Sequence, residues 1–222
     1  MNKYAIIVAG GSGKRMKTKG PKQFLPLDRI PVLMHTLNKF HEAGKQIKQI
    51  VVLPANAIDH WEKLCKKHNF NIPHTVVGGG KTRFHSVRNG LKMVPDEKAL
   101  VAVHDGVRPW ITPALIRNVF RSAHKHGSAI PCLPVNESLR RIKNNKQSIA
   151  VDRNSFCLVQ TPQCFASDTL KKAYQQKYCK SFTDDASVVE AWGGKVHLTE
   201  GEDGNRKITN LGDISHHQIF NF

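Results

Sequence analysis

The chain has 222 residues, of which 40% are hydrophobic, and its 34 Lys and Arg outnumber 17 Asp and Glu, which gives a formal net charge of +17 at pH 7. This length predicts one domain, because domains commonly contain about 100–200 residues. No apolar run reaches the ~18 residues of a membrane span and no signal-peptide pattern is present, so we expect a cytoplasmic protein without a membrane partner. The basic residues are spread along the chain without an aromatic-interleaved module, which favours small anionic substrates over nucleic acid.

Neither the cysteines nor the histidines show the spacing of a metal site. The five cysteines include no Cys-x-x-Cys pair, and the twelve histidines include no His-Glu-x-x-His pattern. Without a secretion signal, these features predict reduced thiols and no cysteine-bound metal.

The first predicted strand, residues 3–9, runs into a glycine-rich loop with strong positive charge. Glycines let backbone N–H groups approach an anion closely, so the loop predicts a phosphate cradle. A Walker loop has Gly at the position of Val8 and Ser or Thr at the position of Arg15, and the dinucleotide fingerprint has Gly at the position of Met16. The loop therefore matches neither motif. The glycines alone are equally consistent with a tight turn beside a solvated basic face. The glycines are Gly10, Gly11 and Gly13, and the basic residues are Lys14, Arg15, Lys17, Lys19 and Lys22.

After this loop, apolar runs alternate with amphipathic stretches. This rhythm predicts an α/β fold with a Rossmann-like, doubly wound, mainly parallel sheet. Thr112-Pro113 is typical of a helix start, and Gly127 of a helix end. Ligands of such sheets bind at the carboxyl ends of the strands. The predicted elements are helix 32–43, strand 49–54, helix 58–68, strand 74–77, helix 82–93, strand 99–104 and helix 113–126.

A second glycine loop, residues 78–80, follows the third predicted strand and leads into a helix. Its backbone amides and the hydroxyl of Ser86 could read the polar edge of a nucleobase, while Arg83 could reach a phosphate or brace the loop. The alternative is a plain turn followed by a capped helix.

Asp105 closes the fourth apolar strand at its carboxyl end. Hard carboxylate oxygens suit Mg²⁺, so Asp105 is a candidate Mg²⁺ ligand or ribose anchor. His104-Asp105 is also the dipeptide of metal phosphohydrolases, but the spacing of the chain does not supply their other histidine ligands.

The residue composition changes after the predicted strand 129–135. Charged residues 139–142, a turn at 143–146 and residues 148–153 predict an inserted β-hairpin. A lone hairpin is marginal in water and these strands contain few apolar residues. We therefore expect this arm, residues 136–155, to pack on a second subunit.

The rest of the chain predicts three more helices and one strand. A helix covers 167–177, and residues 183–187 cap another helix that ends at 193–194. A strand at 195–199 precedes a final short helix.

Ordered motifs along nearly the whole chain share the pattern of one family. They are Ala9 to Met16, Pro21 to Gln23, His104 to Pro109, Val151 to Asn154, Gln160 to Gln163, Thr183 to Ser187 and Asn205 to Thr209. Together they resemble the 2-C-methyl-D-erythritol 4-phosphate cytidylyltransferases of the sugar-phosphate nucleotidyltransferase superfamily. The resemblance implies a single domain of nucleotide-diphospho-sugar transferase type over residues 1–222. It also implies transfer of CMP from CTP to methylerythritol phosphate in the non-mevalonate isoprenoid pathway, with Mg²⁺ or another divalent cation, in a homodimer joined by the arm.

Ribitol-5-phosphate cytidylyltransferases are the nearest alternative, because they share the first loop, the His-Asp motif and the Thr-Pro-Gln motif. Residues 151–154 and 183–187 favour the methylerythritol branch. The chain departs from the family at residues 106–107, where two alanines are usual, and at Cys157, where Trp is common. At Gly204 some members have Asp, so a second carboxylate metal ligand stays open.

Carried over motif by motif, the resemblance implies three groups of site residues. The catalytic group, on the phosphates in the transition state, is Arg15, Lys22 and Lys207. The nucleotide-binding group is Ala9, Gly10, Gly11, Ser12, Gly13, Gly79, Ser86 and Asp105, of which Asp105 also approaches the metal. The acceptor-binding group is Arg108, Arg153, Thr161 and Thr183. A nucleic-acid-binding module and a nucleotide sensor without catalysis stay open as functions of other classes.

Overall fold

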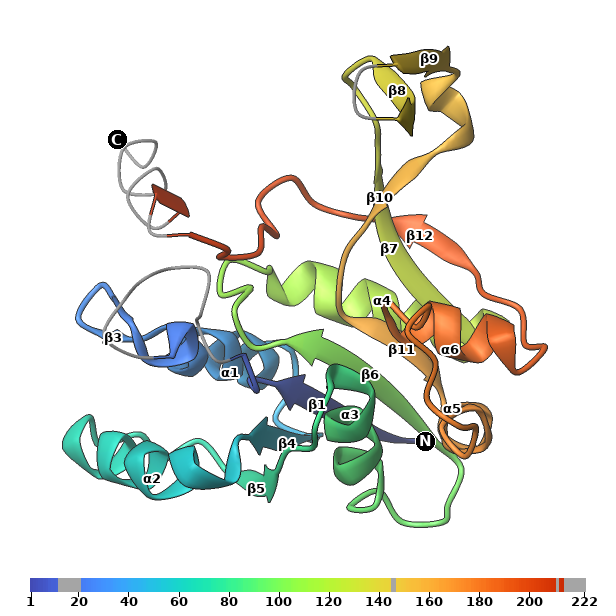
Figure 1. Cartoon of the computed structure of the whole chain (residues 1–222). Coiled ribbons are helices and arrows are strands. Elements are labelled where there is room, and N and C mark those ends of the chain that lie inside the picture. Colours follow the sequence, from blue (N-terminus) through green and yellow to red (C-terminus); the bar gives the residue numbers. More distant parts are fainter. Residues whose placement is uncertain (12–20, 145–146, 211, 214–222) are drawn as a thin grey trace.

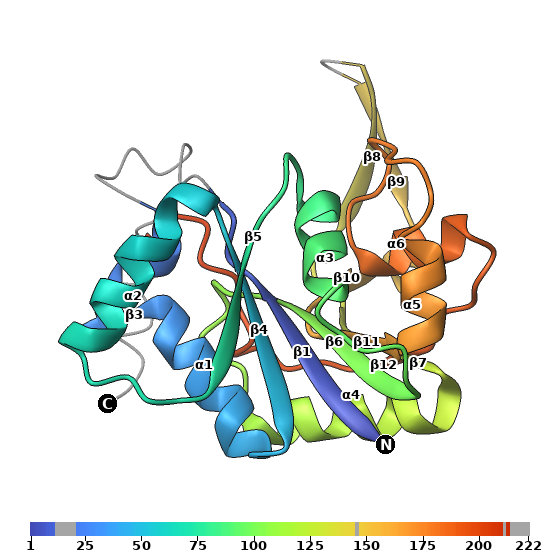
Figure 2. The ribbon, with the colours of Figure 1, turned by 90° about the horizontal axis from the view of Figure 1, so that it is seen from below.

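The computed structural model describes residues 1–11, 21–144, 147–210 and 212–213. Helices cover both faces of a twisted central sheet (Figures 1 and 2). Among the described residues, eight strands form this sheet in the order β10-β7-β11-β6-β1-β4-β5, with β12 also paired to β7. The strands are β1 (Asn2–Val8), β4 (Ile47–Leu53), β5 (His74–Gly78), β6 (Ala99–Asp105), β7 (Ser128–Pro134), β10 (Cys157–Val159), β11 (Gln163–Ala166) and β12 (Leu198–Glu200).

The first four strands of the chain in this sheet are parallel to one another. β1 lies between β4 and β6, and β5 continues the parallel half on the outer side of β4. In the other half, β11 is antiparallel to β6 and β7, β10 is antiparallel to β7, and β12 is parallel to β7. The predicted doubly wound, mainly parallel sheet is confirmed, and the carboxyl ends of β1, β4 and β6 meet at one edge.

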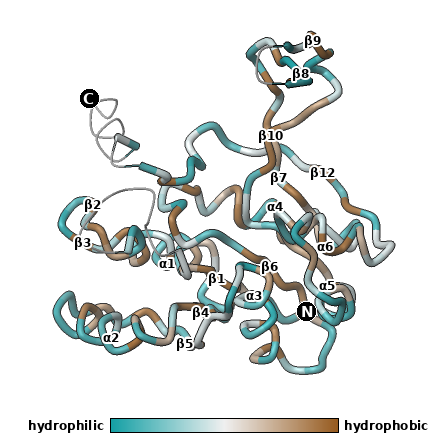
Figure 3. The backbone as a smooth tube through the Cα atoms, in the orientation of Figure 1, coloured by the Kyte–Doolittle hydropathy of each residue, from teal (hydrophilic) through white to brown (hydrophobic). Residues whose placement is uncertain are grey.

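Two hydrophobic cores lie on the two faces of this sheet. One contains residues of α1 (Val32–Ala43), α2 (Ile58–Lys67) and α4 (Pro113–His126), and the other contains residues of α3 (Arg83–Leu91), α5 (Ser167–Ala173) and α6 (Asp185–Ala191). Alternate residues of β1 serve the two cores: Ala5 and Ile7 the first, Tyr4 and Ile6 the second. Because both faces are buried, the strand is apolar without alternation. Figure 3 shows hydrophobic colour along the central strands and mostly hydrophilic colour on outer helices such as α2.

The helix over residues 113–126 begins and ends as its sequence signals predict. The Thr112 side chain accepts from the amide of Leu115 at 3.1 Å, and Pro113 occupies the first helical turn. Gly127 follows the helix with φ of 81°, a left-handed conformation that glycine adopts without strain.

Several short elements were not predicted. Asp28 and Arg29 both have positive φ and form the turn of a two-stranded ribbon, although neither is the glycine that such turns favour. The short elements are β2 (Pro26–Leu27), β3 (Ile30–Pro31), and the 3₁₀ turns η2 (Lys22–Phe24), η3 (Ala55–Ala57) and η4 (Arg153–Ser155).

The predicted hairpin is confirmed as an arm that projects from the body of the molecule (Figure 1). It consists of β8 (Leu139–Asn144) and β9 (Gln147–Val151). The first strand runs two residues into the predicted turn, and residues 145–146 lie outside the described residues.

Most predicted bounds agree within two residues, and the larger differences lie toward the end of the chain. The helix expected over 167–177 ends at Ala173, because the chain leaves it through bonds between residues three apart, from Gln175 to Lys172 and from Gln176 to Ala173. The expected strand 195–199 is β12, which starts and ends later, and the expected final helix lies mostly outside the described residues. Within the described ranges, no helix is long and apolar enough to cross a membrane.

Candidate active site

A cavity of about 640 Å³ opens at the edge where β1 and β6 end. Its lining joins the start of the first glycine loop, the second glycine loop with the start of α3, the end of β6, and the segment near residue 208. The lining residues are Val8, Ala9, Gly10, Gly11, Lys22, Gln23, Gly80, Lys81, Thr82, Arg83, Ser86, Asp105, Val107, Lys207 and Thr209. A second cavity of about 450 Å³, between α1 and the loop after α2, has no Asp, Glu, Lys or Arg among the described residues that line it. The first cavity is therefore the candidate site for a polyanionic ligand.

Asp105 lies at the centre of this cavity wall, surrounded by three cations. Its Oδ1 is 3.4 Å from Arg83 Nε, and its Oδ2 is 3.0 Å from Lys207 Nζ and 3.6 Å from Arg108 Nε. Burial raises the pKa of the carboxyl, but these three cations outweigh burial and hold its pKa below the ordinary value. Asp105 is therefore ionised at neutral pH, and the surrounding charge is net positive.

Arg83 links Asp105 to a second, fully buried carboxylate. Arg83 donates to the two oxygens of Asp185 at 3.0 and 2.7 Å, a bidentate arrangement that connects the first turns of α3 and α6. Tyr174 also donates to Asp185 at 2.6 Å, and its phenol pKa is raised by burial and by that carboxylate. These contacts favour the bracing role for Arg83 over the role of a free phosphate ligand.

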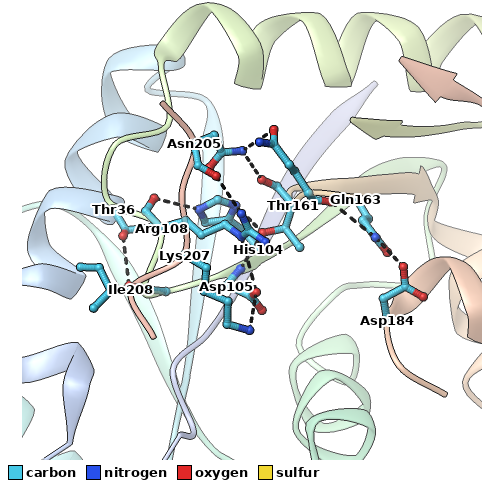
Figure 4. A network of polar contacts seen from close by, with 12 residues as sticks. Thr36, His104, Asp105, Arg108, Thr161, Gln163, Asp184, Asn205, Lys207 and Ile208 are labelled. Atoms are coloured by element: carbon cyan, nitrogen blue, oxygen red, sulfur yellow. Dashed lines mark hydrogen bonds and ion pairs between the residues drawn. The ribbon is translucent and has the colours of Figure 1, made fainter. Parts of the chain in front are cut away.

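Behind Asp105 lies a compact set of polar contacts (Figure 4). The Thr161 hydroxyl accepts from Asp105 N at 3.1 Å and lies 3.1 Å from His104 Nδ1. The other ring nitrogen of His104 is 3.3 Å from the main-chain oxygen of Arg108. Burial lowers the pKa of His104 to about 3, because an imidazolium would lose its hydration there. The imidazole is thus neutral at neutral pH.

Residues 205–209 bring Lys207 to the cavity. Asn205 donates to Thr161 O at 2.8 Å, and Ile208 N donates to Val107 O at 2.9 Å, so the segment is tied both to the residues before β11 and to the turn after β6. Lys22 approaches the same segment and donates to the carbonyls of Ile208 and Thr209, each at 3.4 Å. Two lysines far apart in sequence therefore line the same cavity as Asp105.

The two glycine loops meet across Ser86. A Cβ on Gly79 would lie 3.1 Å from Ser86 Oγ and 3.3 Å from Leu53 O, closer than most Cβ contacts, so the close approach favours glycine. The Ser86 hydroxyl accepts from Gly80 N at 3.1 Å and donates to Thr82 O at 3.0 Å. Gly10 lies on the other side of this hydroxyl, where an added Cβ would be 3.7 Å away. The hydroxyl thus holds the second loop in shape.

The structure gathers seven of the expected site residues in the cavity lining: Ala9, Gly10, Gly11, Lys22, Ser86, Asp105 and Lys207. Gly79, Arg108 and Thr161 lie directly behind the lining, and three residues fall outside the described ranges: Ser12, Gly13 and Arg15.

Arg153 and Thr183 are not among the residues that line this cavity. Arg153 is exposed at the base of the arm, where it donates to the main-chain oxygen of Asn136. Thr183 comes just before α6, whose first turn is closed by a capping box between Asp184 and Ser187. The cavity of one chain therefore does not include every residue that the resemblance implies.

Two residues with clear contacts were missed as site residues. Gln23 is buried, and its side-chain amide donates to Ala9 O at 2.6 Å, which fixes the end of β1. Asp185 is the fully buried partner of Arg83. Both belong to motifs quoted above, but burial of a polar side chain has no signature in sequence alone.

Asp105 is the carboxylate that the described cavity lining offers to a metal. Among the described residues, no three His, Cys, Asp or Glu side chains form a metal-binding group. Asp203, the neighbour of Gly204, is exposed and is not part of the lining. Mg²⁺ is commonly held by one or two carboxylates together with substrate phosphates. The site therefore fits a cation that arrives with a triphosphate.

The family of 2-C-methyl-D-erythritol 4-phosphate cytidylyltransferases matches residues 4–220 of the chain. The chain is 49% identical over 214 residues to the 2-C-methyl-D-erythritol 4-phosphate cytidylyltransferase of Bacteroides thetaiotaomicron, a match that covers 96% of this chain and 97% of the relative. The crystal structure of the enzyme of the same name from Thermus thermophilus is 30% identical with a TM-score of 0.79, over 99% of this chain and 98% of that chain. The 4-diphosphocytidyl-2C-methyl-D-erythritol synthase of Anaerococcus prevotii is 26% identical with a TM-score of 0.83, over 99% and 95% of the two chains.

Proposed function

The chain belongs to the 2-C-methyl-D-erythritol 4-phosphate cytidylyltransferase family, and from this we propose that its cavity transfers CMP from CTP to 2-C-methyl-D-erythritol 4-phosphate. The products are pyrophosphate and 4-diphosphocytidyl-2-C-methyl-D-erythritol, an intermediate of non-mevalonate isoprenoid synthesis. The observation that carries the proposal is the convergence of Lys22, Lys207 and Asp105 beside a glycine loop in one cavity.

The acceptor supplies its own nucleophile. A phosphate monoester has a second pKa near ~6, so its oxygen is mostly ionised at neutral pH and needs no general base. That oxygen forms a bond to the α-phosphorus of CTP, and the bond from the α-phosphorus to the bridging oxygen breaks, so pyrophosphate takes the electron pair. The task of the protein is to bring two polyanions together and to stabilise charge at phosphorus.

We assign that task to Lys22 and Lys207, with Arg15 proposed from its motif. The two lysines approach from separate segments, and both line the cavity with Asp105. In the free chain, backbone carbonyls and one carboxylate hold the two ammonium groups at the cavity. With CTP bound, these groups would stabilise the negative charge that develops on the phosphates in the transition state.

On the nucleotide side, we propose that Ala9, Gly79 and Ser86 face cytosine and that Gly10 and Gly11, with Ser12 and Gly13, cradle the triphosphate. The Ser86 hydroxyl keeps the second loop close to Gly10, which supports a narrow slot for a base.

A divalent cation such as Mg²⁺ is part of the proposal. Asp105 would hold it together with the phosphates, and the ion would neutralise charge on the triphosphate. Arg83, Arg108 and Lys207 surround the same carboxylate, so we expect little affinity for the cation before CTP is bound.

On the acceptor side, we propose Arg108, Thr183 and Arg153, the last of these from a partner chain in a homodimer. Arg153 and the apolar side chains Ile142 and Ile149 of the arm support this arrangement, because they are exposed in one chain and so are accessible to a partner. Five free cysteines support a reducing compartment, and we propose the cytoplasm.

The test is pyrophosphate release from CTP with purified protein, Mg²⁺ and a panel of polyol phosphates. We expect methylerythritol phosphate to give the highest kcat/KM, and ATP, GTP or UTP to replace CTP poorly. A higher kcat/KM for ribitol 5-phosphate would overturn the acceptor assignment. Binding of CTP without pyrophosphate release from any acceptor would indicate a nucleotide sensor instead.

A further inference from the structure

His104 contacts both sides of Asp105 although it does not line the cavity. Through Thr161 it reaches the amide of Asp105, and through the main-chain oxygen of Arg108 it reaches the turn that follows. We propose that His104 is a positioning residue for the transfer reaction, in which one imidazole tautomer holds the Thr161 hydroxyl and the 105–108 turn and so aims the Asp105 carboxylate into the cavity.

The partners of His104 determine which ring nitrogen carries hydrogen. A carbonyl oxygen only accepts, so Nε2 must donate to Arg108 O. The ring is fully buried, and the printed contacts of its two nitrogens among the described residues are a carbonyl and a hydroxyl, with no carboxylate to balance an imidazolium. The imidazole is therefore neutral, so Nδ1 has no hydrogen and accepts. The Thr161 hydroxyl therefore donates its one hydrogen to Nδ1 and accepts from Asp105 N with a lone pair.

Thr161 takes the place of a missing strand partner. Gly106 N donates to Val8 O on the β1 side, so the preceding amide, that of Asp105, points to the β11 side. The β11 ladder with β6 begins at Gln163, opposite Val103, and does not reach Asp105. The hydroxyl supplies the acceptor that the strand no longer provides, and His104 fixes the direction of that hydroxyl.

This arrangement changes the role expected for Thr161. Its only hydroxyl hydrogen is used by His104, so it cannot also donate to an acceptor phosphate while the tautomer persists. Thr161 then acts on the reaction through Asp105, not through direct contact of its hydroxyl with the acceptor.

The kinetic test rests on the proposed function and uses His104→Phe, Thr161→Val and the double variant. Phe suits position 104 because the imidazole already packs against Phe40, with ring centroids 5.1 Å apart. We expect each single variant to lower kcat on the order of 10-fold to 100-fold, as a displaced group at the reacting centre does, with a smaller change in KM for CTP. The double variant should be no slower than the slower single variant, because each single change already disrupts the same set of hydrogen bonds between His104, Thr161 and Asp105.

The matched control is Ser167→Ala, at the opposite end of β6. Ser167 Oγ accepts from Ala99 N at 3.2 Å and donates to Glu97 O at 2.8 Å, so this change removes a buried hydroxyl that supports a strand-end amide in the same way. It should lower the urea midpoint as Thr161→Val does and leave kcat unchanged. Thr161→Ser keeps a hydroxyl and should restore part of the rate lost in Thr161→Val.

A long-range ¹H–¹⁵N NMR spectrum of the wild-type protein tests the tautomer without any reaction. We expect a protonated Nε2 and an unprotonated Nδ1 at His104, and a shifted Nδ1 resonance in Thr161→Val. An Nδ1–H tautomer, additive losses of kcat in the double variant, or an equal loss in Ser167→Ala would each overturn the proposal. A wild-type protein without transferase activity would refute the proposed function instead, and the spectrum would still decide the tautomer.

Discussion

The end of β6 and the arm differ in how their polar and apolar side chains are satisfied within one chain. At the end of β6, Asp105 is 8% exposed and has three cationic partners. In the arm, Ile142 is 77% and Ile149 39% exposed, and the Arg140 guanidinium donates to Ser148 of the neighbouring strand.

The charges at the end of β6 are paired within one chain, whereas the isoleucines of the arm are exposed in one chain. A charge network held by buried partners keeps its geometry before substrate binds, which lowers the cost of organising the site during the reaction. Exposed isoleucines on a two-stranded ribbon gain little from folding alone. We infer that the nucleotide half of the site is formed by each chain, and that the acceptor half needs the arm of a partner.

The largest expected effect comes from the half that is complete. Lys22→Ala should lower kcat on the order of 10²–10³-fold and change CTP binding much less, because a cation that stabilises charge at phosphorus acts in the transition state. Steady-state pyrophosphate release measures both quantities. Lys66→Ala, which removes an exposed lysine of α2, is the control and should match wild type. A normal kcat with a raised KM for CTP would show that Lys22 only binds.

In the incomplete half, replacement of an exposed isoleucine should affect association instead of folding. Burial of an isoleucine in an interface contributes about 1.5–3 kcal/mol, and a two-fold dimer contains two copies, so Ile142→Ser should raise the dimer Kd by at least about 100-fold. Sedimentation equilibrium measures this constant. Met93→Ser removes another exposed apolar side chain, away from the arm, and should leave the Kd unchanged. An unchanged Kd in Ile142→Ser would place the interface elsewhere.

The strands and helices around Asp105 could be predicted from the sequence, because the patterns that specify them are local. Apolar runs, the Thr112 cap and the glycine at 127 specify strands and a helix within a few residues each. The position of Asp105 at the end of a buried strand also followed from that pattern, since carboxyl ends of parallel strands meet at one edge.

The contacts behind Asp105 could not be predicted in the same way. His104 and Thr161 are 57 residues apart, and Arg83 and Asp185 are 102 apart, so their pairing depends on which strands and helices become neighbours. A single sequence states residue types and not such distances. The β2–β3 ribbon was missed for a different reason. Its turn has positive φ at Asp28 and Arg29, and a sequence predicts such a turn mainly when glycine occupies those positions.

The pH dependence of stability should also differ between the two regions. Burial holds the pKa of His104 at about 3 in the folded chain, against 6.5 ordinarily. Between these values the unfolded chain binds a proton that the folded chain does not, so the free energy of unfolding falls as pH decreases, by at most about 1.4 kcal/mol per pH unit, and is constant for this group above both values. Asp105 has a folded pKa below its ordinary 3.8, so the stability that it contributes is present above that value and is lost only as pH falls further.

Urea unfolding between about pH 5 and pH 7 can isolate the histidine contribution, because the Asp105 carboxyl stays ionised in both states over that range. His104→Phe should show a smaller slope of unfolding free energy against pH than wild type. Residues 136–155 contain no histidine, so the arm variant Ile142→Ser should keep the wild-type slope. Equal slopes in wild type and His104→Phe would mean that His104 titrates normally in the folded protein.

The smallest expected effect is the most specific for a site shared between chains. Lys22 lies in the cavity of its own chain, and Arg153 lies outside that cavity, at the base of the arm. If Arg153 serves the partner's site, a heterodimer of inactive Lys22→Ala and inactive Arg153→Ala chains contains one site with both changes and one site with neither.

Free exchange between the two variants gives about half heterodimers, since two-fold symmetry makes the three combinations statistical, and half of their sites are intact. The mixture should therefore recover about a quarter of wild-type activity, measured as pyrophosphate release after subunit exchange has been verified with two different affinity tags. The recovery must appear in kcat and not in KM, because the intact sites are wild type in every residue. Mixtures of Lys22→Ala with Lys207→Ala provide the control: both residues lie in the cavity of one chain, so every heterodimer site carries one of the two changes and no recovery is expected. Verified heterodimers of Lys22→Ala and Arg153→Ala without activity would assign Arg153 to the site of its own chain.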